Sequence, residues 1–284
     1  MIFWIASYPK SGNTWLRALI SSYYYTENGI YTESVIKKIG QFPEKRHFTA
    51  YKYDKNILTD TTRYWIKAQE KINLDKQLKF FKTHNAFGAL NNNQFTNEKN
   101  SIAAIYIVRD PRNVITSLKN HYELDTDQAF KWMKNENNYI YDVQNFKNDG
   151  YSDFQFISSW KTNYKSWKVQ KKFPIKIIKY ENLLNETFVT FKEVVKFINS
   201  IVFQDKKIDT QKLKNSVSST FFDKLKNNEV KDGFSEAVTS KKTNKKIPFF
   251  YLGPKNDWKK ILDKSFQKKI VLEFENECNE LNYK

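Results

Sequence analysis

The chain has 284 residues, which is enough for one large domain with a substantial buried core. Its single cysteine, Cys278, cannot form an internal disulfide, and one cysteine with three histidines leaves little for a transition-metal site. The net charge of +17 would suit a nucleic-acid binder, but 43 of the 48 basic residues are lysines spread along the whole chain, as on a solvated surface.

The chain opens with the pattern of a strand that turns directly into a helix. Residues 2–7 read as a short buried strand, and apolar residues at helical spacing follow over 15–23. Such a turn leaves free N–H groups at the helix N-terminus, where the helix dipole also favours an anion. Gly12 permits a tight backbone, Lys10 adds a positive charge, and the neighbouring serine and threonine add hydroxyls. This first loop therefore predicts a phosphate site.

The first loop is not a Walker A motif. That motif places its lysine directly after the second of two glycines and adds a hydroxyl that holds magnesium. Here Lys10 comes two residues before Gly12, and no glycine lies upstream of it. The sequence therefore disfavours a nucleoside triphosphatase.

A second strand-like run covers residues 78–84 and ends in Lys-Thr-His. The imidazole of His84, with an ordinary pKa near 6.5, can accept a proton at neutral pH. Of the other histidines, His47 lies in a polar stretch without a motif. His121 lies at a helix end, where a cation would satisfy the dipole. His84, at the end of a strand, is therefore a candidate proton acceptor.

The second phosphate motif follows a continuous apolar run over 102–108, which is typical of a parallel strand covered on both faces. Pro111 suits the first turn of the next helix, and the aspartate before it suits the cap. Arg109 and Ser117 lie eight residues apart, about two helical turns, so both can reach one anion. Arg112 flanks the same turn, and a planar guanidinium suits phosphate better than a lysine.

Three later segments complete the pattern. Residues 175–183 read as a fourth strand that ends in Tyr-Glu-Asn-Leu; Ser-Thr-Phe-Phe covers 219–222; and Gly-Pro-Lys-Asn-Asp-Trp-Lys covers 253–259. Together with the first loop, Lys-Thr-His and the arginine–serine pair, these segments resemble, in family order from residue 3 to about 260, the sulfotransferases that use 3′-phosphoadenylyl sulfate (PAPS). The resemblance implies a P-loop-NTPase-like three-layer α/β fold with a central parallel sheet flanked by helices.

The resemblance also implies roles for individual residues. His84 would be the general base, Lys10 would sit at the leaving phosphate, and Lys82 would face the transferring sulfonate. The implied contacts to PAPS, and to its product 3′-phosphoadenosine 5′-phosphate (PAP), are Lys10, Ser11, Gly12, Asn13, Thr14, Trp15, Arg109, Ser117, Tyr180, Thr220, Phe222, Gly253 and Lys255. No metal enters the implied mechanism.

Two motifs depart from the family pattern. Asn13 stands where a threonine is usual, which keeps a polar side chain. In the closing loop, Tyr251 and Leu252 replace an Arg-Lys pair, and Asn256 replaces the second glycine, so a 3′-phosphate contact from this loop is open.

Residues 1–284 are expected to form a single sulfotransferase domain. Two segments inserted between sheet units, about 41–73 and about 120–159, would wall the acceptor pocket, although their aromatic residues could equally be core. Residues 226–248 are charged and poor in apolar residues, which predicts a mobile surface loop or lid.

The predicted function is transfer of a sulfonate from PAPS to a hydroxyl, with an amine as second choice, on an unidentified small-molecule, glycan or lipid acceptor. A kinase or other phosphotransferase of the same fold is the alternative enzyme, and a basic polyanion or nucleic-acid binder is the alternative non-enzyme. No signal peptide and no run of 18 apolar residues is present, so we expect a cytoplasmic protein without a membrane span. The oligomeric state is open, a homodimer included.

Overall fold

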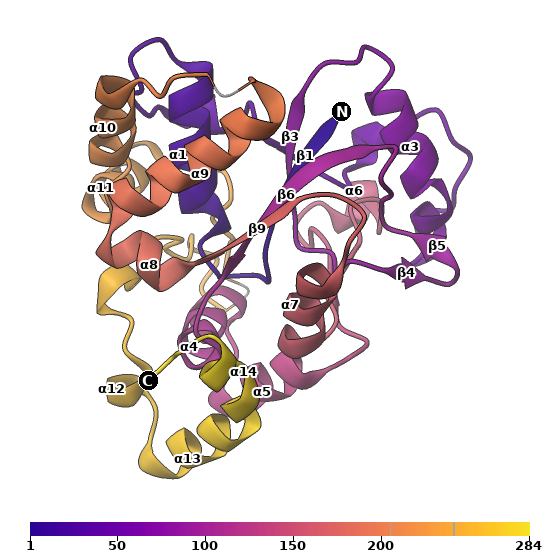
Figure 1. The fold of residues 1–284 in the computed structure, drawn as a ribbon. Helices are drawn as coiled ribbons and strands as arrows, with labels where there is room; N and C mark the ends of the chain where they lie inside the picture. The colour runs from indigo at the N-terminus through magenta and orange to yellow at the C-terminus, as the bar shows by residue number, and fades with distance from the viewer. Residues whose placement is uncertain (205, 241) are drawn as a thin grey trace.

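The computed structural model describes residues 1–204, 206–240 and 242–284. In this described part, the largest sheet has five parallel strands in the order β2-β3-β1-β6-β9 (Figure 1). Its strands are β1 (Ile2–Ala6), β2 (Gly40–Gln41), β3 (Lys79–Thr83), β6 (Ser101–Val108) and β9 (Ile175–Lys179). The four strands predicted from the sequence are present, and β2 is a two-residue addition at one edge. The fourth strand ends at Lys179 and not at residue 183, because a helix begins at Tyr180.

Alternate residues of the two central strands enter different cores. Phe3 and Ile5 of β1 pack into one apolar cluster, whereas Trp4 and Ala6 pack into another. The same alternation divides Ile105 of β6 from its neighbours. Because successive side chains of a strand point to opposite faces, helices must cover both sides of the sheet.

The helices form the two outer layers (Figure 1). The helices up to the last sheet strand are α1 (Asn13–Tyr25), α2 (Glu33–Ile36), α3 (Trp65–Ile72), α4 (Pro111–Tyr122), α5 (Thr126–Lys134), α6 (Phe146–Asp149) and α7 (Trp160–Val169). The later ones are α8 (Tyr180–Asn185), α9 (Thr187–Val202), α10 (Thr210–Ser219), α11 (Phe222–Asp232), α12 (Trp258–Ile261), α13 (Lys264–Glu273) and α14 (Glu275–Glu280). One face carries α1, α9 and α10, and the other carries α7 with the helices of the inserted segments.

Short elements fill the connections. They are the hairpins β4 (Ala89–Leu90) with β5 (Asn93–Gln94) and β7 (Tyr139–Ile140) with β8 (Gln155–Phe156), and the 3₁₀ turns Lys45–His47, Asp60–Tyr64 and Gly253–Lys255. No helix in the described ranges is both long and apolar enough to cross a membrane.

The segment predicted as a loop over 226–248 is helical up to Asp232, because α11 continues into it. Leu225 of α11 is buried against Ala18, Tyr31 and Phe250, and this packing holds the helix on the domain. The remainder of the segment is irregular apart from one bridge between Thr239 and Lys246. Residue 241, which falls inside it, lies outside the described residues.

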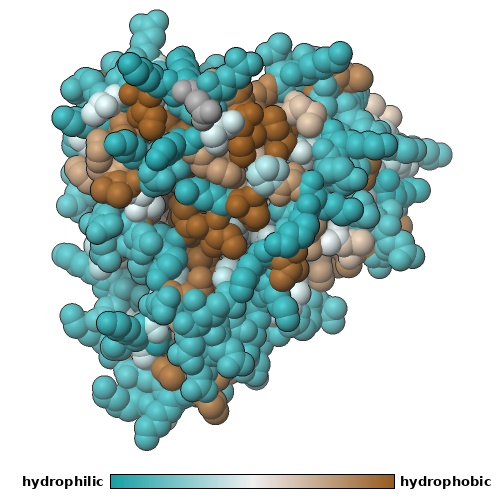
Figure 2. All heavy atoms as spheres, viewed as in Figure 1, coloured by the Kyte–Doolittle hydropathy of each residue, from teal (hydrophilic) through white to brown (hydrophobic). Residues whose placement is uncertain are grey.

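The chain direction places a binding crevice at one edge of the sheet. From β1 the chain moves to β3 on one side, and then crosses back to β6 and β9 on the other. In open parallel sheets, ligands bind beyond the carboxyl ends of the strands where the order reverses, which here is around β1. Figure 2 shows mostly hydrophilic residues on the visible face, with apolar residues gathered across its middle.

Candidate active site

The carboxyl ends of four strands open into one large cavity. Ser7 follows β1, His84 follows β3, Arg109 follows β6 and Tyr180 follows β9. The last three line a cavity of about 1630 Å³. This volume exceeds the roughly 300–1,000 Å³ of a single small-ligand pocket, so it has room for two substrates side by side.

The first loop adopts a left-handed backbone conformation at two positions, with φ of 63° at Lys10 and 100° at Gly12. A Cβ added at Gly12 would lie 2.5 Å from Cδ2 of Tyr180, so this position requires glycine. Asn13 holds the loop in place, since its Nδ2 donates to the carbonyl oxygen of Ile5 at 3.0 Å. The asparagine that stands in place of the usual threonine therefore stabilises the backbone of the loop.

The other side chains of the loop differ in exposure. Thr14 and Trp15 line the cavity, and the Trp15 ring meets Tyr180 edge-on with centroids 5.9 Å apart. Ser11 is buried, and within the described residues its hydroxyl has no hydrogen-bond partner. The loop thus carries a buried, unpaired hydroxyl next to the N-terminus of α1.

The second phosphate motif lies directly against the first loop. Nη1 of Arg109 donates to the carbonyl oxygen of Lys10 at 3.0 Å, and the guanidinium carbon lies 4.4 Å from the centroid of the Tyr180 ring. The Nε of Arg109 is buried and lacks a partner in the described part of the chain. Ser117 lines the same cavity from α4. The arginine and serine that the sequence paired therefore share one cavity with the first loop.

Arg112 points elsewhere. It is buried, and its Nη2 lies 2.7 Å from Oδ2 of Asp110 and 2.9 Å from the carbonyl oxygen of Lys284. Its guanidinium carbon lies 4.6 Å from the ring centroid of Trp258. The backbone N–H of Arg112 also donates to Asp110, which caps α4 as the sequence predicts. Arg112 is therefore a structural residue of this turn.

His84 is oriented by the backbone of the first strand. Its Nδ1 lies 2.8 Å from the carbonyl oxygen of Ser7, which can only accept, so Nδ1 carries the proton. Its backbone N–H donates to Oε1 of Gln155 at 2.7 Å. Burial, together with the charge of Lys82, lowers the pKa of His84 to about 3. The imidazole is thus neutral at physiological pH, with Nε2 free to accept a proton.

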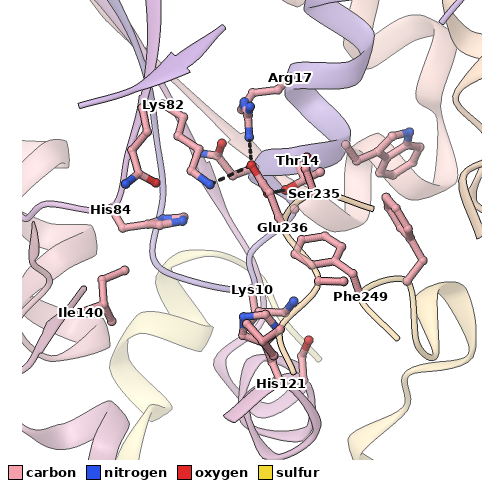
Figure 3. Close-up of a pocket in the computed structure, with 18 of the residues that line it drawn as sticks. Lys10, Thr14, Arg17, Lys82, His84, His121, Ile140, Ser235, Glu236 and Phe249 are labelled. Atoms are coloured by element: carbon pink, nitrogen blue, oxygen red, sulfur yellow. Dashed lines mark hydrogen bonds and ion pairs between the residues drawn. The ribbon is translucent and has the colours of Figure 1, made fainter. Parts of the chain in front are cut away.

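Lys82 and two residues not predicted from the sequence form a cluster beside His84 (Figure 3). The carboxylate of Glu236 accepts from Arg17 Nη1 at 2.5 Å, from Thr14 Oγ1 at 2.9 Å and from Lys82 Nζ at 3.0 Å. Burial alone would raise the pKa of Glu236, but the charges of Lys82 and Arg17 hold it well below its usual range. Burial lowers the pKa of Lys82 against the opposing charge of Glu236.

Lys10 is covered by the same segment that carries Glu236. Its Nζ lies 3.9 Å from the centroid of the Phe249 ring. Burial lowers the pKa of Lys10 to about 7, although the charge of Glu236 acts in the opposite direction. His121 lines the cavity as well, and burial and the charge of Lys10 lower its pKa to about 2. His121 lies in the last turn of α4, as the sequence predicts, but its lowered pKa makes it a neutral imidazole and not the expected cation.

The residues implied for the nucleotide by the later motifs separate into two groups. Phe222 and Gly253 line the cavity and touch each other, since a Cβ on Gly253 would lie 2.3 Å from the Phe222 ring. Thr220 is fully buried, and its hydroxyl donates to the carbonyl oxygen of Ser216 at 2.8 Å. Lys255 is exposed outside the cavity lining.

The inserted segments contribute unequally to the cavity. From the first segment, Gln41 and residues 44–46 line the cavity. From the second segment, a longer stretch around Tyr141 and Asp153 lines it. The aromatic residues of the first segment are mostly core, as Phe42 and Trp65 show by their near-complete burial.

The family of the chain follows from comparison with known proteins. A family model described as the sulfotransferase domain matches residues 2–281. The chain belongs to the sulfotransferase domain family. It is 25% identical over 251 residues to a luciferin sulfotransferase of Photinus pyralis, a match that covers 86% of this chain and 61% of the relative.

Two solved structures have the same fold as this chain. A mouse sulfotransferase complexed with PAP superimposes with a TM-score of 0.58 and 18% identity, covering 98% of this chain and 83% of the other. Retinol dehydratase in complex with androsterone and PAP superimposes with a TM-score of 0.58 and 14% identity, covering 98% of this chain and 80% of the other. The predicted P-loop-NTPase-like fold, a parallel sheet between layers of helices, is confirmed.

Proposed function

We propose that this chain is a PAPS-dependent sulfotransferase that moves a sulfonate group to a hydroxyl of its acceptor, with an amine as second choice. The hydrogen bond from Arg109 to the carbonyl oxygen of Lys10 carries the proposal, because it brings both phosphate motifs to one cavity. That cavity also contains His84 and Lys82. A bisphosphate nucleotide and a proton acceptor can therefore meet in one place.

The residues around the first loop fit a nucleotide with a 5′-phosphosulfate. The buried hydroxyl of Ser11 and the buried Nε of Arg109 are unpaired donors within the described residues, and unpaired buried donors are costly unless a ligand satisfies them. The N-terminus of α1 and the ammonium of Lys10 add favourable fields for an anion. Ser117 would complete the contact to the 3′-phosphate on the Arg109 side.

The chemistry assigned to these residues is a single in-line displacement. The acceptor oxygen forms a bond to sulfur while the bond from sulfur to the bridging oxygen breaks, and PAP leaves. The acceptor proton passes to Nε2 of His84, which the Ser7 carbonyl keeps as the free nitrogen. Lys10 offsets charge that develops on the leaving phosphate, and Lys82 offsets charge on the transferring sulfonate. One well-aimed group of this kind typically contributes about 3–4 kcal/mol to the lowering of the barrier.

The acceptor would enter from the side of the second inserted segment. Apolar residues such as Ile140 and Val143 stand there beside carboxylates such as Asp142 and Asp153. This mixed lining supports a small molecule, a glycan or a lipid carrying a hydroxyl, and we propose no narrower class from it. The single cysteine suits the cytoplasmic location that we include in the proposal.

The test begins with the nucleotide, which needs no knowledge of the acceptor. Binding of PAP is measured by calorimetry, and transfer of label from sulfur-labelled PAPS is then followed over a panel of alcohols, phenols, amines and glycans in the presence of EDTA. We expect micromolar or tighter binding of PAP and label transfer without metal. Consumption of ATP with magnesium, in place of PAPS, would instead identify a phosphotransferase.

A further inference from the structure

The carboxylate of Glu236, which lies in the irregular stretch after α11, fills the space between the first loop and His84. Its three partners, Thr14, Arg17 and Lys82, all belong to the sheet edge and the first helix. None of these partners is closer than 154 residues in the sequence. The contact is therefore a tertiary docking of the segment onto the loop (Figure 3).

The three donors are held in place independently of Glu236. Thr14 stands in the first turn of α1, and Lys82 is on β3. Arg17 is only 5% exposed, and its Nη2 donates to the carbonyl oxygen of Ile39 at 3.0 Å. Two cations and a hydroxyl thus converge on one point, where a single negative charge sits now. Such a preorganised set of charged donors binds an oxyanion of any chemistry.

The position of this point matches the needs of the transfer reaction. Lys82 reaches this point from the end of β3, with His84 beside it, and Thr14 reaches it from the helix that begins at the first loop (Figure 3). A sulfonate moving from a phosphate on the first loop to an acceptor beside His84 must pass between these elements. The carboxylate of Glu236 therefore occupies the place of the transferring group.

We propose that Thr14, Arg17 and Lys82 form the subsite for the transferring sulfonate, and that Glu236 fills this subsite until the donor displaces it. The inference rests on the proposed function and adds to it Arg17, a residue outside the motifs, and Glu236, an internal competitor.

The exchange conserves charge at the subsite. The terminal sulfonate group of PAPS carries one negative charge, as does the ionised Glu236, so the two cations keep the same charge balance before and after the donor binds. The charges of Lys82 and Arg17 hold the pKa of Glu236 low, so the carboxylate stays ionised throughout the neutral range. The same segment carries Phe249 over Lys10, so its displacement uncovers the ammonium assigned to the leaving phosphate.

The experiment compares two nucleotides that differ only in the sulfonate. Dissociation constants of PAPS and PAP are measured for the wild-type protein, Arg17→Lys and Glu236→Gln. Asp149→Asn is the matched control, because Asp149 lines the same cavity and pairs with Lys45 outside the subsite. Arg17→Lys keeps the charge of a buried residue, and Glu236→Gln changes a half-buried side chain in an irregular segment, so both variants should fold.

We expect Arg17→Lys to weaken the binding of PAPS about tenfold and that of PAP less than about threefold, because the variant loses a charge-assisted hydrogen bond to the sulfonate. We expect Glu236→Gln to tighten PAPS binding by about tenfold, with a smaller effect on PAP binding. Asp149→Asn should change the affinity for either nucleotide little. Equal effects of both variants on PAPS and PAP would overturn the subsite and leave the proposed function standing. Failure of the wild-type protein to bind either nucleotide would contradict the proposed function itself.

Discussion

Nη1 of Arg109 lies 3.0 Å from the carbonyl oxygen of Lys10, although 99 residues separate them in the chain. The contact exists because β1 and β6 are neighbours in the sheet and end at the same edge. It joins the loop assigned to the 5′ end of the nucleotide to the arginine assigned to its 3′-phosphate. A change at Arg109 should therefore act on the nucleotide and leave the fold largely intact.

Arg109→Ala is expected to weaken PAP binding by about tenfold to a hundredfold, because it removes a charge-assisted contact to a phosphate. Calorimetric titration with PAP measures the change. Arg112→Ala, three residues away, is the control. It breaks a buried ion pair with Asp110 and should lower the free energy of unfolding by about 3–5 kcal/mol. Unchanged PAP affinity in Arg109→Ala would remove this arginine from the site.

His84→Ala is expected to lower kcat by at least about a hundredfold while the protein stays folded, since the variant loses its proton acceptor. Sulfonate transfer under saturating PAPS measures kcat, and thermal unfolding reports the fold. His47→Asn serves as the control because His47 does not line the cavity. Near-normal turnover of His84→Ala would assign the base elsewhere.

Acid should destabilise the protein through its histidines. Burial lowers the pKa of His47 to about 4 and, with the charge of Lys82, that of His84 to about 3. The unfolded chain protonates imidazoles near pH 6.5, whereas the folded protein keeps these two neutral. Their contribution to stability is therefore present above pH 6.5 and is lost as the pH falls from 6.5 toward 3. Imidazole NMR signals that titrate near pH 6.5 in the folded protein would contradict this expectation.

Lys10 should take up a proton when PAP binds. Burial lowers its pKa to about 7, so at pH 8 much of the free protein carries a neutral amine. A phosphate beside it favours the ammonium and raises the pKa, so affinity for PAP should fall as the pH rises above 7. Calorimetry at pH 8 in buffers of different ionisation enthalpy measures the proton count. Lys10→Met should abolish the uptake; persistence of the full uptake in that variant would exclude Lys10 as its source.

The sheet and the two phosphate motifs were predictable because each signal is local. An apolar run followed by a turn residue and a helix cap fixes a strand end, and parallel strands place such ends at one edge. His84 was reached by the resemblance of Lys-Thr-His, and its hydrogen bond to Ser7 gives that resemblance a physical basis.

Other features depended on tertiary contacts that no local pattern encodes. Glu236 lies in a charged stretch with no motif, and its partners are 154 to 222 residues away. Arg17 carried a weak signal, because it lies three residues after Thr14 and therefore on the same helix face. The charge of His121 could not be predicted from its place at the end of α4, because desolvation and the charge of Lys10 lower its pKa.

The hydrogen bond between His84 and Ser7 has a consequence for how the reaction could be aligned. Ser7 and Lys10 belong to the same four-residue stretch of backbone that leaves β1, so the groups proposed as proton acceptor and as leaving-group cation are anchored to a common support. Thermal motion of this stretch would carry both groups together. If the proposed roles hold, main-chain geometry sets the spacing between the two ends of the reaction axis, and an acceptor that matches that spacing is correctly aimed.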